Sequence, residues 1–164
     1  MKKKGGFSFL VVLYLMVLTM SFNSVAAQIE VERYTTANES YVREVNPLRG
    51  VFFSAADLKL TNLNGKIGVI AHGYMNVPVD EVYMTIYLDR LEESNGVTHW
   101  SQVDYYEFEF FAKDYPNGLT LATKDFTIIN QPKNHTYRLR GQFAAFLDGA
   151  MEGFGPVTDG VFIE

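Results

Sequence analysis

The sequence contains no cysteine in 164 residues. This absence excludes disulfide bonds, thiolate metal ligands, a cysteine nucleophile and a lipid-modified N-terminal cysteine. A domain built from this chain must therefore be stable through its core alone, and the chain is long enough to bury such a core.

The motifs of common enzyme and cofactor classes are also missing. The sequence has no G-x-S-x-G serine elbow, phosphate-binding loop, dinucleotide fingerprint or calcium loop. The three histidines, His72, His99 and His135, lie far apart, and none has a second histidine at the i+2 or i+4 spacing of a metal site. We therefore predict no catalytic residue, no metal and no cofactor, and a protein that is not an enzyme.

The N-terminus is predicted to be a signal peptide. Lys2 to Lys4 form a basic segment, the apolar stretch of residues 7–22 follows, and Val25-Ala26-Ala27 supplies the small residues that a signal peptidase reads. Sixteen helical residues rise only about 24 Å, short of the roughly 30 Å hydrocarbon core. We expect cleavage after Ala27 and a location outside the cell or in its envelope. An uncleaved N-terminal anchor is the alternative, and it would be the one route to a membrane.

Positive charge is scarce in the rest of the chain. Removal of residues 1–27 takes away three lysines and no acid, so 11 basic residues remain against 19 acidic ones and the formal charge becomes −8. A nucleic-acid-binding surface or a patch that docks on anionic lipid would be basic. We therefore expect a protein or a glycan as the partner, and no nucleic acid.

The apolar residues that follow recur with the period of two that is typical of strands. Residues 28–50 are predicted to be a linker or a loosely attached strand, and residues 51–164 the folded domain. Asn64-Gly65 between two alternating segments predicts a hairpin, and similar turn signals recur along the domain. The pattern predicts an all-β, antiparallel two-sheet sandwich of about seven strands. A helix over residues 142–152 is the one rival element.

Short motifs resemble known sandwich proteins. Thr136-Tyr137, Leu139, Gly141 and the loop 149–155 are similar to the closing strands of fibronectin type III and immunoglobulin-like domains. A second set of motifs resembles small, uncharacterised exported sandwich proteins of Gram-positive anaerobes: Gly65-Lys66, Leu88-Asp89-Arg90 and Trp100. The resemblance covers residues 55–164. It implies the fold and transfers no active site.

The segment 99–111, HWSQVDYYEFEFF, carries the only tryptophan and five other aromatic residues. In a strand, Tyr106, Phe108 and Phe110 share one face, which is wholly aromatic and suits the core. Trp100 has the same parity if no bulge intervenes, and is then predicted to be a core anchor. Tyr105 and Glu107 face the other way.

This segment leaves three functions open. The pattern favours a non-catalytic binding or structural module with an ordinary core strand. A carbohydrate-binding module that uses Trp100, Tyr105 and Tyr106 is the alternative. A glycoside hydrolase that uses Glu107 and Glu109 is the second, because residues at i and i+2 are about 6.8 Å apart.

Two arginines carry one further prediction. Arg138 and Arg140 alternate with apolar residues, so they share the outer face of their strand. We predict that they pair with acids of a neighbouring strand. An anion-binding site is the functional alternative.

Overall fold

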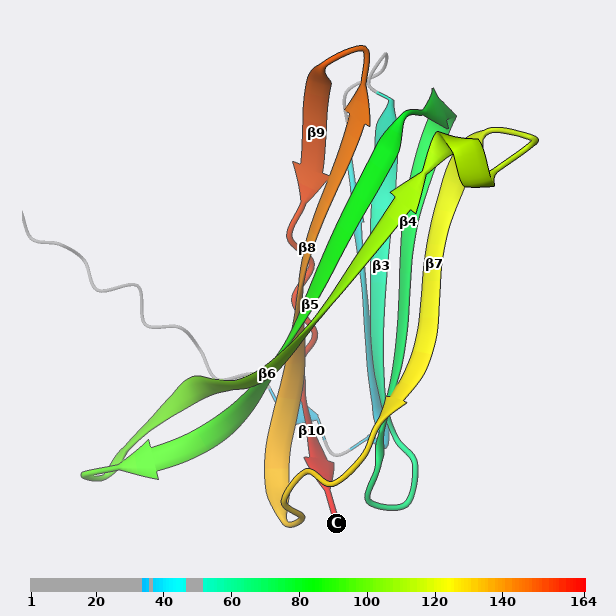
Figure 1. Ribbon diagram of the computed structural model, residues 1–164. Coiled ribbons are helices and arrows are strands. Elements are labelled where there is room, and N and C mark those ends of the chain that lie inside the picture. Colours follow the sequence, from blue (N-terminus) through cyan, green and yellow to red (C-terminus); the bar gives the residue numbers. More distant parts are fainter. Residues whose placement is uncertain (1–33, 36, 47–51) are drawn as a thin grey trace, which may run out of the picture. The chain divides into compact units, whose positions relative to one another are not determined.

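The computed structural model describes residues 34–35, 37–46 and 52–164 (Figure 1). The predicted signal peptide lies outside these residues. The described part of the chain forms ten strands: β1 (Tyr34–Thr35), β2 (Glu39–Val45), β3 (Phe53–Asn62), β4 (Ile67–Val79), β5 (Glu81–Ser94), β6 (Val97–Phe111), β7 (Leu119–Ile128), β8 (His135–Leu147), β9 (Ala150–Phe154) and β10 (Gly160–Ile163). Its one helical element is a 3-10 turn, η1 (Ala112–Asp114). None of the described helical structure could cross a membrane.

The strands form two sheets, which confirms the predicted sandwich. A six-stranded sheet has the order β1-β10-β8-β5-β6, with β9 also paired to β8, and a four-stranded sheet has the order β2-β3-β4-β7. All pairings are antiparallel except that of β1 with β10. The strand count exceeds seven partly because residues 34–35 and 39–45, placed by the sequence in the linker or loosely attached strand, form β1 and β2.

The core lies between the two sheets and follows the predicted alternation. In β5, for example, Val82, Ile86 and Leu88 are fully buried, and Met84 is nearly so. The buried residues of β4 and β8 alternate in the same way. Each fully buried aliphatic side chain of this kind contributes about 1.5–3 kcal/mol, so the alternation fixes which face of each strand points inward.

Two turns with positive φ angles decide the local structure at the ends of strands. The β3–β4 hairpin turns at Asn64-Gly65, whose φ angles of 56° and 82° are both positive, as such a turn requires. The chain also turns at Asp148-Gly149, with φ angles of 50° and 79°, between β8 and β9. The rival helix over residues 142–152 is therefore wrong, because these residues form a second hairpin.

A β-bulge in β6 overturns the predicted position of Trp100. Leu88 pairs with Asp104, but Asp89 pairs with Gln102, so Val103 is an extra residue in the strand. The extra residue reverses the parity of everything before it. Gln102 and Trp100 therefore lie on the outer face of the six-stranded sheet, and Trp100 is not a core anchor.

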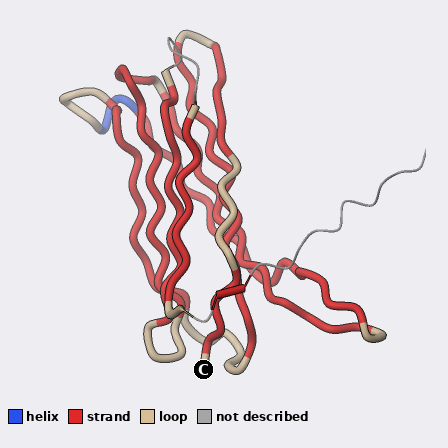
Figure 2. Tube along the Cα trace, turned by 180° about the vertical axis from the view of Figure 1, so that it is seen from behind, coloured by secondary structure: helices blue, strands red, loops and turns tan. Residues whose placement is uncertain are grey.

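The same two strands extend beyond the body of the sheet. Pairing of β5 with β8 ends at Arg90 and Tyr137, whereas pairing of β5 with β6 continues to Ser94 and Val97. The last part of the β5–β6 hairpin consequently projects as a two-stranded arm, which is visible in both views (Figures 1 and 2). Trp100 lies at the base of this arm.

Candidate functional site

The outer face of the six-stranded sheet gathers aromatic side chains along β5, β6 and β8. Strand alternation places five of them there, and the bulge in β6 places Trp100 there. Ring contacts join the five into two groups, one around Tyr83 and one around Tyr87. The members of this outer aromatic face are Tyr83, Tyr87, Trp100, Tyr105, Phe111 and Phe146.

Tyr105 is the most accessible part of this face. Its side chain is 55% exposed, and it lies directly across from Tyr87 in the β5–β6 ladder. The two ring centroids are 6.5 Å apart, and the ring planes are inclined by only 34°. The hydroxyl of Tyr87 donates to Oε1 of Gln142 on β8 at 3.1 Å, which fixes the ring. The two rings are therefore adjacent but tilted to each other, and only the ring of Tyr105 is exposed to solvent.

A buried carboxylate organises the charged part of the face. Asp89 of β5 is only 2% exposed. Nε of Arg138 donates to Asp89 Oδ2 at 3.1 Å, and Nε of Arg140 donates to the same oxygen at 2.7 Å. A second nitrogen of Arg140 reaches Asp89 Oδ1 and Gln102 Oε1, each at 3.1 Å. The predicted pairing of both arginines with an acid of a neighbouring strand is confirmed.

Each of these arginines also covers an aromatic ring. The guanidinium carbon of Arg138 lies 4.5 Å from the centroid of Trp100, and that of Arg140 lies 4.8 Å from the centroid of Tyr87. Cation–π contacts of this kind hold the guanidinium planes against the sheet. The indole nitrogen of Trp100 is buried and has no hydrogen-bond partner among the described residues.

A similar cluster on the other sheet shows what such a carboxylate does for the fold. Asp57 of β3 is 5% exposed and accepts hydrogen bonds from Arg43 and from the Tyr74 hydroxyl. Arg43 again lies over the tyrosine ring, 4.8 Å from its centroid. Burial of the Tyr74 hydroxyl, together with its bond to Asp57, raises the pKa of Tyr74. A buried aspartate that holds arginine against tyrosine is thus a structural device of both sheets.

Tyr106 does not belong to the outer face. Its ring points inward beside Phe108, and both rings pack against Phe126 of β7, with centroids 5.1 and 5.4 Å from it. The hydroxyl donates to Oδ2 of Asp104 at 2.6 Å. Burial and this hydrogen bond raise the pKa of Tyr106. Of the three residues predicted for a carbohydrate site, the structure places Trp100 and Tyr105 on one face and Tyr106 on the opposite one.

The two glutamates of the hydrolase hypothesis stand on an open surface. Glu107 and Glu109 are exposed and lie opposite Thr85 and Tyr83 on the outer face. Neither glutamate lines the pocket beside Asn62 and Gly65 or the one beside Phe143 and Phe154. No group of three or more metal-ligating side chains occurs in the described ranges.

Two residues of this site were not identified from the sequence. Tyr87 lies directly across from Tyr105, and Gln142 accepts a hydrogen bond from the Tyr87 hydroxyl. Alternation placed both on the outer faces of their strands. The pairing of β5 with β8 could not be read from the sequence, because 40 residues separate Ser94 from His135 along the chain.

Comparison with known proteins adds no assignment. The chain matches no protein-family model and no curated protein sequence.

Proposed function

We propose that the protein is an exported, non-catalytic module that binds its partner through the outer face of the six-stranded sheet, outside the cell or in its envelope. The observation that carries this proposal is the exposed ring of Tyr105 beside Tyr87, framed by Gln102, Gln142 and the Arg140–Asp89 pair. Exposed aromatic and arginine side chains are the groups that most often dominate binding energy at protein surfaces.

Export is proposed on the N-terminal sequence, with its basic, apolar and small-residue segments in the order of a signal peptide. The resemblance to small exported sandwich proteins supports the same location. The immunoglobulin or fibronectin type III subtype remains a prediction. The strand order gives it no support, since β2, β3 and β4 are successive neighbours in one sheet, whereas constant-type immunoglobulin domains place their third strand in the opposite sheet.

A carbohydrate is the ligand class that the outer face suits best. A sugar ring has apolar C–H surfaces that stack on an aromatic ring, and hydroxyl groups that pair with amides and charges at its rim. Tyr105 supplies the ring, whereas Gln102, Gln142 and Glu107 supply exposed polar groups around it. A protein partner would use the same aromatic and arginine side chains, so binding experiments have to include both.

The test is affinity electrophoresis through gels that contain soluble cell-wall and plant polysaccharides. We expect at least one polysaccharide to retard the protein, and Tyr105→Ala to weaken that binding at least about tenfold, which corresponds to 1.4 kcal/mol. Tyr41→Ala is the matched control, because Tyr41 is also 55% exposed but lies on β2 of the other sheet. If binding to polysaccharides and to envelope proteins survives Tyr105→Ala unchanged, the outer face is not the binding surface.

The hydrolase is the weaker alternative, because Glu107 and Glu109 project from an exposed strand rather than into a cleft. Release of reducing sugar from a bound polysaccharide, abolished by Glu107→Gln or Glu109→Gln, would replace the non-catalytic proposal by this one.

A further inference from the structure

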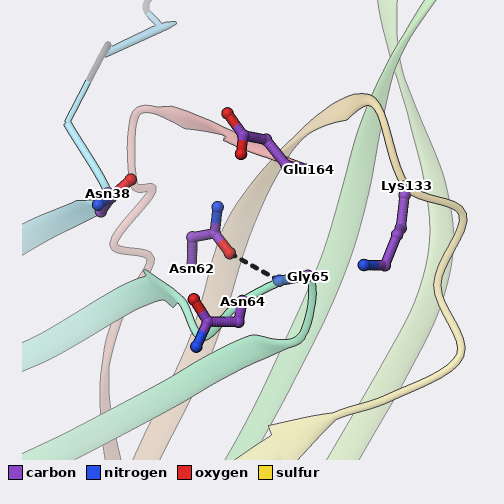
Figure 3. Close-up of a pocket in the computed structure, with 6 residues that line it drawn as sticks. All are labelled: Asn38, Asn62, Asn64, Gly65, Lys133 and Glu164. Atoms are coloured by element: carbon purple, nitrogen blue, oxygen red, sulfur yellow. Dashed lines mark hydrogen bonds between the residues drawn. The ribbon is translucent and has the colours of Figure 1, made fainter.

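A polar pocket of about 360 Å³ lies at the end of the sandwich where the β3–β4 turn meets the end of β10 (Figure 3). This volume is at the lower end of the range for small-molecule sites. Four segments far apart in the sequence build the pocket, and none belongs to the outer aromatic face. The lining residues are Asn38, Asn62, Asn64, Gly65, Lys133 and Glu164.

Asn62 holds the floor of this pocket in place. Its side-chain oxygen accepts the N–H of Gly65 at 3.0 Å, and its side-chain nitrogen donates to the carbonyl of Phe162 at 3.1 Å. The backbone N–H of Asn62 donates to the carbonyl of Asn38 at 2.7 Å. One residue thereby ties the β3–β4 turn to the start of β2 and to β10, so the pocket is a fixed part of the fold.

Gly65 keeps the pocket open. A Cβ atom at this position would overlap Nζ of Lys133 and would lie 2.6 Å from the backbone oxygen of Glu164. The residue also has a φ of 82°, a conformation that favours glycine. Lys133, from the loop between β7 and β8, directs its ammonium group toward Gly65 (Figure 3).

The other polar side chains around the pocket have no partner within the described part of the chain. No hydrogen bond or ion pair joins the side chain of Asn38, Asn64, Lys133 or Glu164 to a described residue. Together they present ammonium and amide donors next to carboxylate and amide acceptors. Asn62, with both ends of its amide occupied, is the exception.

We propose that this pocket binds one neutral, polyhydroxylated unit of the saccharide type. The charges of the Lys133 and Glu164 side chains are opposite, so an anionic ligand would face Glu164 and a cationic ligand would face Lys133. A hydroxyl group both donates and accepts, and it therefore satisfies an ammonium, a carboxylate and an amide in turn. The pocket lacks the stacking surface of the outer aromatic face, so its ligand is held by hydrogen bonds alone.

The test is NMR titration of the full domain with methyl glycosides of glucose, galactose, mannose and N-acetylglucosamine. Glucuronate and glucosamine serve as the anionic and cationic analogues. We expect at least one neutral glycoside to shift the amide signals of Asn62, Asn64 and Gly65 in fast exchange, with a Kd of about 1–10 mM. Glucuronate and glucosamine should bind at least about threefold more weakly.

Two variants remove pocket side chains that could bond to the ligand and should leave the fold intact. The side chains of Asn38 and Lys133 are exposed and form no hydrogen bond or ion pair with a described residue. Asn38→Ala and Lys133→Ala should each weaken binding about fivefold or more. Lys66→Ala is the matched control, since Lys66 is exposed beside Gly65 but does not line the pocket.

Several results would overturn the proposal: no shift at these amides with any neutral glycoside, stronger binding of a charged analogue, or equal affinity in Lys133→Ala and Lys66→Ala. Tyr105→Ala separates this pocket from the outer face. It should weaken polysaccharide retardation at least about tenfold and leave the glycoside shifts at Gly65 unchanged, so each site can fail without the other.

Discussion

The guanidinium carbon of Arg138 lies 4.5 Å from the ring centroid of Trp100. This contact exists because the extra residue Val103 turns Trp100 to the outer face of the sheet. Arg138→Ala is expected to uncover the indole ring and to increase quenching of its fluorescence by acrylamide. The matched control is Arg43→Ala, which removes the corresponding arginine from the other sheet and should leave quenching unchanged. Equal quenching in the wild-type protein and Arg138→Ala would contradict this contact.

Asp89 is expected to be the most important acid for stability on this face. Its replacement by alanine leaves Arg138 and Arg140 without their shared acceptor, and their side chains are only 13% and 36% exposed. We expect Asp89→Ala to lower the free energy of unfolding by about 2–3 kcal/mol, below the range for fully buried pairs because Arg140 reaches solvent. Glu107→Ala, which removes an exposed acid, should change it by less than about 0.5 kcal/mol. Urea unfolding measures both, and a similar loss in the two variants would contradict a special role for Asp89.

Two Asn-Gly turns offer a matched comparison of glycine substitutions. Gly65 and Gly96 both have positive φ, 82° and 75°. A Cβ atom at Gly96 would meet no atom within 4 Å, whereas one at Gly65 would overlap Lys133 and approach Glu164. We expect Gly96→Ala to cost about 1 kcal/mol of stability, from backbone strain alone. Gly65→Ala should cost more and should also abolish glycoside shifts at the pocket. Equal costs and unchanged shifts would mean that Lys133 moves aside freely.

Stability should fall at alkaline pH. Burial and the bond to Asp104 raise the pKa of Tyr106 above its ordinary value of 10.0. The unfolded chain ionises near that value while the folded chain keeps the proton. The contribution of Tyr106 to the free energy of unfolding is therefore constant below pH 10. It decreases as the pH rises from there toward the pKa of the folded state. Raised pKa values of Tyr74, Tyr83 and Tyr137 act in the same direction.

Tyr106→Phe should make this alkaline decrease shallower, since one of the tyrosines that cause it is removed. Unfolding in urea at several pH values, combined with the absorbance of tyrosinate, measures the effect. An unchanged slope in Tyr106→Phe would show that Tyr106 ionises alike in the folded and unfolded chains.

The sequence predicts the sandwich correctly because burial imposes a period of two that is preserved along β4, β5 and β8. The inward positions of β5, the hairpin at Asn64-Gly65 and the pairing of Arg138 and Arg140 with an acid of a neighbouring strand follow from that period and from turn chemistry. The structure confirms each of them.

The position of Trp100 could not be predicted in this way. Val103 is an apolar residue in an apolar and aromatic strand, and nothing in its type marks it as the bulge. The bulge moves Trp100 to the face of Tyr105, whereas alternation alone places Tyr105 and Tyr106 on opposite faces. The pairing of Tyr87 with Tyr105 needed strand register, and the polar pocket needed four segments that only the folded chain brings together.

Binding of the partner by the outer face of the six-stranded sheet can be measured by titrating the fluorescence of Trp100 with the polysaccharides that retard the protein. Trp100 is the only tryptophan, and it shares this face with Tyr105. We expect a bound polysaccharide to shift the emission and to protect Trp100 from acrylamide, and Tyr105→Ala to abolish both effects. A polysaccharide that binds without altering the emission or the quenching of Trp100 would contradict binding by this face.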